Sequence, residues 1–279
     1  MIEDKLYFEN IKWEILLDKK VDFKIEGKVA IIRLIDPDNF NPLSIESGKQ
    51  LRDVLEKLQS NDQIRALIII GTGKAFSAGG NIKQFKESIE RGNPGQLMDD
   101  LTKDLYNIAK ILRLYNKPVV AAVNGWAVGA GMNLALSCDI VIASEKARFR
   151  QSFSKLALIP GFAGSIILSR QLTWQQASEM AFFGDTYTAE DMKKLGLINE
   201  IVSPDKLEET SMEWAQKLAN GPTLTYARTK KLFFDALSTP LEEHLENERQ
   251  MQIKSAETED YKIGVFAISE KKEPKFIGK

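Results

Sequence analysis

Three short apolar runs constrain the fold of this chain more than any other feature of its sequence. They occupy residues 66–70, 119–123 and 139–143, and only the last contains a charged residue. Runs of this length without polar alternation are typical of strands that are buried on both faces of a parallel sheet. A helical pattern over Met98–Leu114 separates the first two runs. The alternation of strand and helix therefore predicts an α/β fold.

The rest of the chain divides into regions of different pattern. Residues 21–25 and 29–34 flank Glu26-Gly27-Lys28 and predict a β-hairpin. Ser44 is a candidate N-cap for a helix over 47–59. We expect an appended arm at residues 1–20, a mixed core at 21–200 and a helical region at 201–279. Beyond about residue 170 the predicted helices are 174–183, 188–195, 204–219, 222–237 and 240–255.

Composition excludes several classes of function. Lys and Arg total 38 against 39 Asp and Glu, and this balance is unlike that of a dedicated nucleic-acid binder. With one cysteine, Cys138, and one histidine, His244, the chain cannot form an internal disulfide, a cysteine zinc site or a two-histidine metal site. Its first residues lack the pattern of a signal peptide, and no apolar stretch approaches the length of a membrane span. We therefore expect a cytoplasmic protein without a metal, a nucleic-acid partner or a membrane partner.

Two loops of small residues follow the first two apolar runs. They span residues 74–82 (KAFSAGGNI) and 124–133 (NGWAVGAGMN). Ligands of open α/β sheets bind beyond the carboxyl ends of the strands. Small residues there expose backbone N–H groups, and one N–H from each loop can hold an oxygen that becomes negative during a reaction. The alternative is that these glycines and alanines serve only tight turns and close packing.

Longer motifs identify the chain as a member of the crotonase superfamily, the enoyl-CoA hydratase/isomerase family. The resemblance covers residues 21–279 and includes NPLS at 41–44 and KAFSAGGNIKQF at 74–85. It continues with the segments 117–144, 149–165, 184–202 and 270–279. The resemblance implies a β-β-α spiral core with a helical C-terminal trimerisation region. It further implies a homotrimer or a dimer of trimers that binds an acyl-CoA thioester, with coenzyme A as part of the substrate and no other cofactor.

The resemblance also assigns roles to residues. It implies an oxyanion hole made by the backbone N–H groups of Ala78 and Ala130, around the thioester oxygen. The segment Ala78, Gly79, Gly80, Asn81 and Ile82 lies along the pantetheine and acyl arm. Other expected substrate or coenzyme A contacts are Asn41, Pro42 and Leu43 near the adenine, Trp126, Gly129, Phe153 and Gly161 near the acyl group, and Lys271, Lys272 and Lys275 near the phosphates.

The sequence departs from the family pattern at the positions of the catalytic acids. Family hydratases carry two catalytic glutamates at the positions that match Asn133 and Phe153. Neither an amide nor a phenyl ring is a general base, so two-glutamate hydration is disfavoured. Members that resemble 1,2-epoxyphenylacetyl-CoA isomerase share the Asn and the Phe. They have an Asp where this chain has Gly161, so the third possible acid is missing as well.

No other side chain is a clear substitute for these acids. For several other polar or reactive residues a structural or solvent-exposed role is the stronger interpretation: His244, Asp139, Asp185, Thr188 with Asp191, Lys83, Gln84 and Cys138. Three further residues can form hydrogen bonds with a substrate but are not bases: Gln151, Ser152 and Ser154. We predict an isomerase or lyase of fatty or aromatic acid degradation, which stabilises a thioester enolate and uses Asn133 to orient a substrate group or water. The alternatives are a decarboxylase of the same superfamily and a coenzyme A thioester-binding homologue with little turnover.

Overall fold

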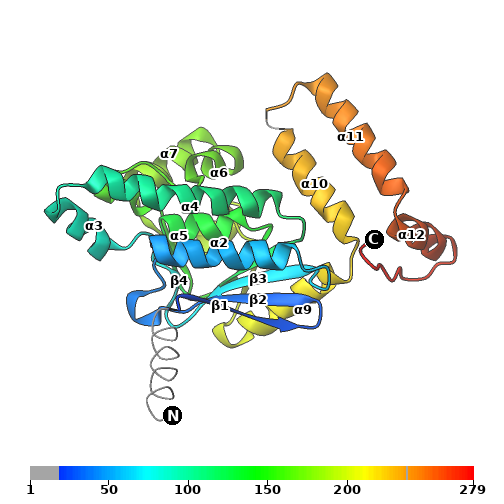
Figure 1. Ribbon diagram of the computed structural model, residues 1–279, viewed down its shortest axis with the longest axis horizontal. Coiled ribbons are helices and arrows are strands. Elements are labelled where there is room, and N and C mark those ends of the chain that lie inside the picture. Colours follow the sequence, from blue (N-terminus) through cyan, green and yellow to red (C-terminus); the bar gives the residue numbers. More distant parts are fainter. Residues whose placement is uncertain (1–18, 237) are drawn as a thin grey trace, which may run out of the picture.

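A computed structural model describes residues 19–236 and 238–279, so the predicted arm at 1–20 falls almost wholly outside the described residues (Figure 1). The predicted α/β class is confirmed. A six-stranded sheet has the order β1-β2-β3-β5-β7-β10. β1 and β2 form the predicted antiparallel hairpin, and each later neighbour pairs in parallel. The strands are β1 (Val21–Glu26), β2 (Val29–Leu34), β3 (Ala66–Gly71), β5 (Val119–Val123), β7 (Ile140–Ser144) and β10 (Glu200–Val202).

A second sheet of three-residue strands lies beside the first. It has the order β4-β6-β8-β9, with strands β4 (Ala75–Ser77), β6 (Trp126–Val128), β8 (Arg148–Arg150) and β9 (Thr186–Thr188). Each of β4, β6 and β8 closely follows a strand of the large sheet, and the chain then continues into helix. This repeated strand, short strand and helix is the β-β-α spiral that the resemblance implies. The sequence patterns did not predict the short strands, because three residues are too few to show a period.

Helices cover the two sheets and continue to the C-terminus. The predicted helices after residue 170 are confirmed, with ends shifted by a few residues, and so is a helix at the end of the first loop, α3, whereas α6 and α12 were not predicted. The helices are α2 (Ile45–Gln59), α3 (Ile82–Glu90), α4 (Pro94–Leu114), α5 (Ala130–Ser137), α6 (Gly164–Gln171), α7 (Trp174–Phe183), α8 (Ala189–Lys194), α9 (Leu207–Ala219), α10 (Thr223–Asp235), α11 (Leu241–Ala256) and α12 (Glu259–Ser269). Short 3-10 turns lie at Pro37–Asn39, Ser152–Leu156 and Pro204–Lys206.

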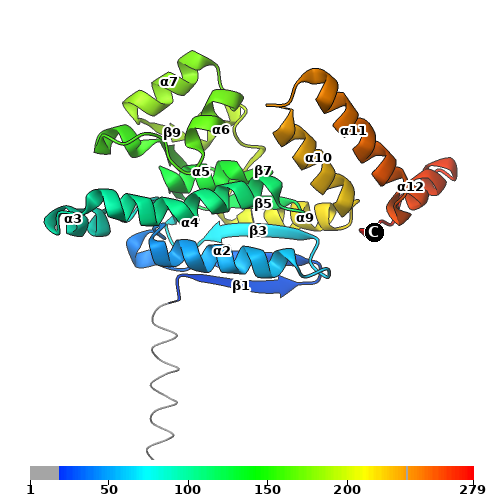
Figure 2. The ribbon, with the colours of Figure 1, turned by 45° about the horizontal axis from the view of Figure 1, so that its top comes forward.

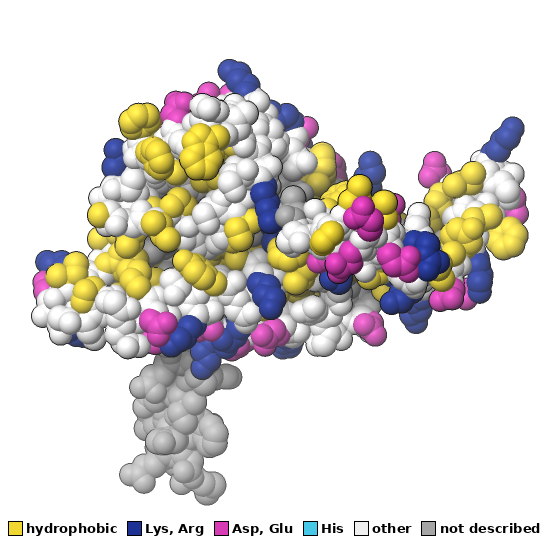
Figure 3. Space-filling model, turned by 90° about the horizontal axis from the view of Figure 1, so that it is seen from above, with side chains coloured by type: hydrophobic (Ala, Val, Ile, Leu, Met, Phe, Trp, Pro, Cys, Tyr) yellow, Lys and Arg dark blue, Asp and Glu magenta, His cyan; other side chains and the backbone are white. Residues whose placement is uncertain are grey.

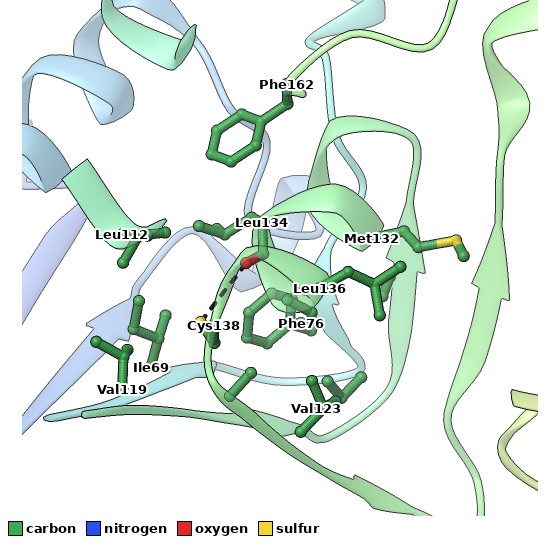
Figure 4. Close-up of a cluster of buried hydrophobic side chains, with 14 of the residues drawn as sticks. Ile69, Phe76, Leu112, Val119, Val123, Met132, Leu134, Leu136, Cys138 and Phe162 are labelled. Atoms are coloured by element: carbon green, nitrogen blue, oxygen red, sulfur yellow. Dashed lines mark hydrogen bonds between the residues drawn. The ribbon is translucent and has the colours of Figure 1, made fainter. Parts of the chain in front are cut away.

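The large sheet is buried on both faces, as its apolar strands predict. Leu67 and Ile69 belong to a cluster with residues of α2, α4 and α5, and Figure 4 shows part of this cluster around Phe76 and Cys138. Ile68 and Ile70 point to the opposite face, where they pack with residues of α9. Figure 1 shows α9 on the lower side of the strands and α4 above them. Alternate side chains of one strand therefore fill two cores, which is why β3 has no polar position.

The helices α10, α11 and α12 form an arm that extends away from the core (Figures 1 and 2). Lys230 of α10 joins the arm to the core. Its ammonium group donates to the Asp139 carboxylate at 2.8 Å and to the carbonyls of Leu112 and Lys117. Asp139 in turn accepts from the Val119 N–H at 2.8 Å, so its interpretation as a structural residue is confirmed. No helix in the described part of the chain is both long and apolar enough to cross a membrane.

Hydrophobic side chains stay exposed along this arm, as the extension at the right of Figure 3 shows. Phe233, Leu241, Phe266 and Ile268 are each at least 65% exposed. Single exposed apolar side chains are ordinary on soluble proteins, whereas this projecting arm carries several of them.

Replacing Lys230 with alanine leaves a half-buried carboxylate and two carbonyls without their shared donor. We expect Lys230→Ala to lower the free energy of unfolding by about 3 kcal/mol. Chemical denaturation of wild type and variant measures this difference. Lys231→Ala is the matched control, because Lys231 pairs on the exposed surface with Asp235 four residues away. It should change the stability by less than ~0.5 kcal/mol. Equal effects of the two substitutions would contradict the anchoring role of Lys230.

Candidate active site

One cavity of about 230 Å³ lies beside the first glycine-rich loop, α4, the beginning of α5 and the segment 152–162. Apolar side chains form most of its wall, and the hydroxyl groups come from Thr102, Tyr106 and Ser152. The lining residues are Ala78, Gly80, Ile82, Phe85, Met98, Leu101, Thr102, Tyr106, Gly129, Ala130, Ser152, Phe153, Leu156, Leu158, Ile159, Gly161 and Phe162. Residues of both predicted loops therefore reach the same cavity.

The segment 40–43 holds the first loop in place. The Asn41 amide donates to the carbonyls of Thr72 and Ala75 at 2.9 and 2.8 Å, and the Leu43 N–H donates to the Gly79 carbonyl at 2.7 Å. The side chains of Asn41 and Leu43 are both buried. These two side chains are therefore engaged within the fold, while the expected position of the segment 41–43 near an adenine ring stays a prediction. Their role in this structure is to support the loop.

The two glycine-rich loops touch through their backbones. A Cβ atom on Gly79, whose φ is +77°, would lie 2.4 Å from the Val128 carbonyl oxygen. A Cβ on Gly131 would lie 2.3 Å from the Ser77 carbonyl oxygen. Real Cβ contacts with backbone are not this short, so only glycine permits the approach. Close packing, one of the two alternatives from the sequence, is thus confirmed for these glycines, while ligand access stays a prediction.

One backbone N–H from each loop remains available at the cavity. Ala130 opens α5, and the first N–H groups of a helix have no acceptor within it. The N–H of Ala78 instead donates to the Phe40 carbonyl at 2.8 Å. Gly80 forms a parallel bridge with Leu43, in which the Leu43 N–H bonds to Gly79. In a parallel bridge of this kind Leu43 bonds to the neighbours of Gly80 and not to Gly80 itself. The N–H of Gly80 therefore points away from Leu43.

The structure thus corrects one half of the predicted oxyanion pair. Ala130 keeps an unpaired N–H at the cavity, and the unpaired N–H of the first loop belongs to Gly80 rather than to Ala78. The local sequence offers no way to choose between them, because the acceptor for Ala78 belongs to a distant segment. The N-terminal end of α5 adds a partial positive charge at the same place.

Asn133 is completely buried and does not line the cavity. Its amide nitrogen donates to the Gly161 carbonyl at 2.7 Å, and its amide oxygen accepts from the Gln151 side chain. A Cβ on Gly164 would clash with the Asn133 amide at 2.2 Å. Asn133 therefore holds the segment around Gly161. Contrary to the expectation from the sequence, it is not placed to orient a substrate group or water.

Phe153 and Gly161 do line the cavity, as expected, but neither supplies an acid. Among the described residues of the wall there is no carboxylate and no histidine, and Tyr106 is the one side chain with an ionisable proton. Nor does the described part of the chain hold three or more His, Cys, Asp or Glu side chains grouped to bind a metal ion. The cavity can therefore stabilise developing negative charge through backbone N–H groups, with little acid or base of its own.

Other candidates from the sequence lie elsewhere. Thr188 and Asp191 form the predicted capping box of α8. Cys138 is buried, and the apolar surroundings raise the pKa of its thiol to about 12, so it is inert core as predicted. The residues that the structure does not place in the cavity wall are Asn81, Lys83, Gln84, Trp126, Gln151, Ser154, Asp185 and His244. Asn81 instead caps α3, where its side chain accepts from the N–H groups of Lys83 and Gln84.

The C-terminal tail does not reach the cavity of its own chain. The Phe276 carbonyl accepts from Arg65, and the N–H groups of Ile277 and Gly278 donate to Asp260. Arg65 precedes β3, so six residues of strand, or about 20 Å, separate it from the loop after Gly71. Figure 1 shows the C-terminus at the end of the sheet opposite α3. A contact between Lys275 and a ligand in this cavity would need the tail of another subunit.

The sequence interpretation missed one wall of the cavity. Met98, Thr102 and Tyr106 recur every four residues on α4 and form a stripe along its face. This spacing marks one side of a helix, but a stripe of this kind usually packs into a core. Only the tertiary structure distinguishes it from the neighbouring stripe of Leu101, Leu105, Ile108 and Leu112, all of which belong to the core, although Leu101 also reaches the cavity.

Comparisons with known proteins find relatives that match nearly the whole chain. A family model described as enoyl-CoA hydratase/isomerase matches residues 24–279. The chain is 33% identical to 1,2-epoxyphenylacetyl-CoA isomerase of Escherichia coli strain K12, over 91% of this chain and 97% of that protein. It is also 33% identical to a probable mitochondrial enoyl-CoA hydratase of Dictyostelium discoideum, over 91% of this chain and 89% of that protein. The crystal structure of an enoyl-CoA hydratase from Polaromonas sp. JS666 superposes with a TM-score of 0.88 at 31% identity, covering 92% of this chain and 99% of that one.

The position of Asn133 requires a hydrogen-bond donor that faces a carbonyl. Asn133→Asp replaces that donor with a carboxylate oxygen, and we expect the free energy of unfolding to fall by about 3 kcal/mol at neutral pH. Burial and the facing carbonyl raise the folded-state pKa of the new carboxyl above its unfolded value near 4. The folded state then binds more protons than the unfolded state, so the loss shrinks as the pH falls toward 4.

Denaturation curves at several pH values measure this effect. Asn107→Asp on the exposed face of α4 is the matched control, and it should stay within ~0.5 kcal/mol of wild type. If the loss of unfolding free energy in Asn133→Asp did not depend on pH, the donor role of the Asn133 amide would be contradicted.

Proposed function

Because the chain belongs to the enoyl-CoA hydratase/isomerase family, we propose that it is an acyl-CoA isomerase or lyase that stabilises a thioester enolate. The thioester oxygen lies between the N–H groups of Gly80 and Ala130, and the acyl group occupies the apolar cavity. Coenzyme A enters as part of the substrate, so the proposal includes no separate cofactor. The name of the relative from Escherichia coli, an isomerase of an aromatic acyl-CoA, supports this class of reaction.

The convergence of two unpaired backbone donors on an apolar cavity carries the proposal. An enolate bears its negative charge on the former carbonyl oxygen, so donors aimed at that oxygen favour the enolate over the neutral thioester. The surrounding wall contains mostly apolar side chains. In a poorly solvated site each such donor is worth about 3 kcal/mol of transition-state stabilisation. This is enough to support catalysis that uses no strong acid or base from the wall.

The reaction is not the two-glutamate addition of water. The side chain at one of the two glutamate positions, Asn133, is committed to hydrogen bonds with Gly161 and Gln151. The other position presents the ring of Phe153 to the cavity. Neither side chain is a base that activates water. In a double-bond shift a group of the substrate itself or a bound water takes the proton from the acyl chain, the C–H electron pair forms the enolate, and the proton then returns at another carbon.

A second candidate, decarboxylation, is favoured by the same lack of a base in the wall. When the substrate carries a carboxylate on its α-carbon, the C–C bond breaks and its electron pair forms the enolate as carbon dioxide leaves. The enolate then takes one proton from solvent at the α-carbon. The substrate itself supplies the electrons, so the protein contributes only the two N–H donors.

The exposed arm supports a proposal of self-association. The apolar side chains on α10, α11 and α12 project from a part of the molecule that contacts its own core mainly through α10. We assign this surface to subunit contacts in a homotrimer or a dimer of trimers, as the family resemblance implies.

Incubation of the purified protein in heavy water with a panel of acyl-CoA thioesters tests the reaction class by mass spectrometry. The panel contains saturated, 2-enoyl, 3-enoyl, aromatic, epoxide and malonyl-type acyl groups. We expect isotope uptake at the α-carbon or a moved double bond. Loss of carbon dioxide from the malonyl-type thioester supports the second candidate. Gain of water would contradict the proposal, and thioesters that bind but stay unchanged would make the protein a binding homologue.

Gly131→Ala tests the oxyanion pair. The added methyl group meets the Ser77 carbonyl oxygen, so the two loops must separate and the two N–H groups no longer point at one oxygen. We expect the rate of isotope uptake to fall at least about 100-fold. Gly95→Ala, where a Cβ meets nothing within 4 Å, is the matched control and should keep the wild-type rate. Circular dichroism checks that both variants fold. A folded Gly131→Ala protein with full activity would exclude the proposed donors.

A further inference from the structure

A second cavity lies on the face of the large sheet that α9 covers, opposite the candidate active site. It has a volume of about 200 Å³. The strands contribute Ile31, Ile68, Ile70 and Ala122 to its wall, and α9 contributes Ser211 and Met212. Ile68 belongs to the core cluster on that face, whereas Leu101 and Phe162 of the active-site cavity belong to the cluster on the other face. The sheet therefore separates the two cavities.

The wall of this second cavity contains a buried hydroxyl group that the fold does not use. Ser211 is the polar residue in the buried stripe through which α9 packs on the sheet. Hydroxyls within helices usually bond to the carbonyl four residues earlier, as those of Thr102 and Ser255 do at 2.7 Å. Ser211 is completely buried, and its Oγ has no hydrogen-bond partner in the described part of the chain. A buried hydroxyl in this state gains free energy from any ligand group that bonds to it.

The charged side chains of the wall do not call for a charged ligand. All four of them have an opposite charge within 2.7 Å: Lys24 with Glu26, Glu208 with Arg33, and Glu209 with Lys206. An ionic ligand would have to displace one of these partners and would lose its hydration against the isoleucine side chains. An uncharged ligand meets neither cost, so the wall favours a neutral molecule.

The size of the cavity sets the size of that molecule. An apolar cavity of about 150 Å³ in an engineered protein binds benzene. The present cavity, at about 200 Å³, therefore holds a six-membered ring together with one small polar group. The isoleucine side chains of the strands remove the ring from water, and the Ser211 hydroxyl can both donate to and accept from the polar group.

We propose that this cavity is a second ligand site, which binds a small uncharged alcohol of ring size, with phenol as the simplest example. The ring of the ligand lies against Ile68 and Ile70, and its hydroxyl bonds with Ser211. The inference goes beyond the proposed function, because no residue of the active-site wall takes part in it. The strands β3 and β5 that contact the ligand lead directly into the two glycine-rich loops.

Two methionines report on the two cavities separately, because Met212 lines this one and Met98 lines the active-site cavity. Phenol is titrated into protein with isotope-labelled methionine methyl groups, and NMR follows their signals. We expect the Met212 signal to shift and to saturate with a Kd of about 1 mM, as befits a ligand with so few atoms. The same titration with benzene measures the contribution of the ring alone.

Ser211→Ala removes only the hydroxyl. We expect it to raise the Kd for phenol at Met212 about tenfold, the equivalent of one net hydrogen bond, and to change the Kd for benzene less than about twofold. Ser169→Ala is the matched control, because Ser169 is exposed on α6 and its hydroxyl already donates to the Ile166 carbonyl. It should retain the wild-type Kd for both compounds.

Two results would overturn the inference. A Met212 signal that does not respond to phenol, with or without a response of Met98, would mean that the second cavity holds water only. If Ser211→Ala left the phenol Kd unchanged, or raised the Kd values for phenol and benzene equally, the Ser211 hydroxyl would not contact the ligand. The titration uses no acyl-CoA and no turnover, so its failure leaves the proposed function untouched.

Discussion

The backbone contact between the two glycine-rich loops is the constraint on which the site depends. Gly131 lies against the Ser77 carbonyl, and Gly79 lies against the Val128 carbonyl, at distances that no Cβ atom permits. The strands β3 and β5 are parallel neighbours, so both loops leave the sheet at the same edge. That arrangement brings two residues with unpaired N–H groups, Gly80 and Ala130, to the wall of one cavity. The cavity, its polarity and its chemistry all follow from this meeting.

A buried polar network adjoins that contact and supports the wall without serving as acid or base. Asn133 links Gly161 to Gln151 through both ends of its amide, at a position where family hydratases are expected to carry a glutamate. A carboxylate could not donate to the Gly161 carbonyl, so the local structure requires an amide. This chain thus has an amide that fixes the segment around Gly161 where a titrating group is expected. The cavity beside it is apolar, so backbone dipoles act there at low dielectric.

Much of the fold was predictable because its causes are local. The apolar strands, the hairpin and the helices after residue 170 each show a period or a turn pattern that survives in the structure. The short strands β4, β6 and β8 were missed, because a three-residue strand is specified by its partner and not by its own pattern. The arm helix α12 and the helix α6 were missed as well. The division of the chain into a core and a helical region was a prediction from pattern, and the structure adds that α9 packs on the sheet while α10–α12 project from it.

The site was predictable only in part, and the failures have a common origin. The sequence places two small-residue loops after two strands, and it shows that the expected acids are absent. Whether Ala78 or Gly80 has a free N–H depends on the Phe40 carbonyl, which belongs to another segment. Whether Asn133 faces a ligand or the core, and whether the stripe on α4 lines a cavity, depend in the same way on neighbours that are remote in sequence.

The sequence by itself determined the α/β class, the family resemblance and the two loops, since periodicity and motif spacing are properties of contiguous residues. The tertiary structure alone decided which N–H groups stay unpaired, which polar side chains are consumed by the fold and which tyrosine reaches the cavity. A hydrogen bond occupies a donor only when its acceptor is near, and for these groups the acceptor is brought near by the packing of the whole chain.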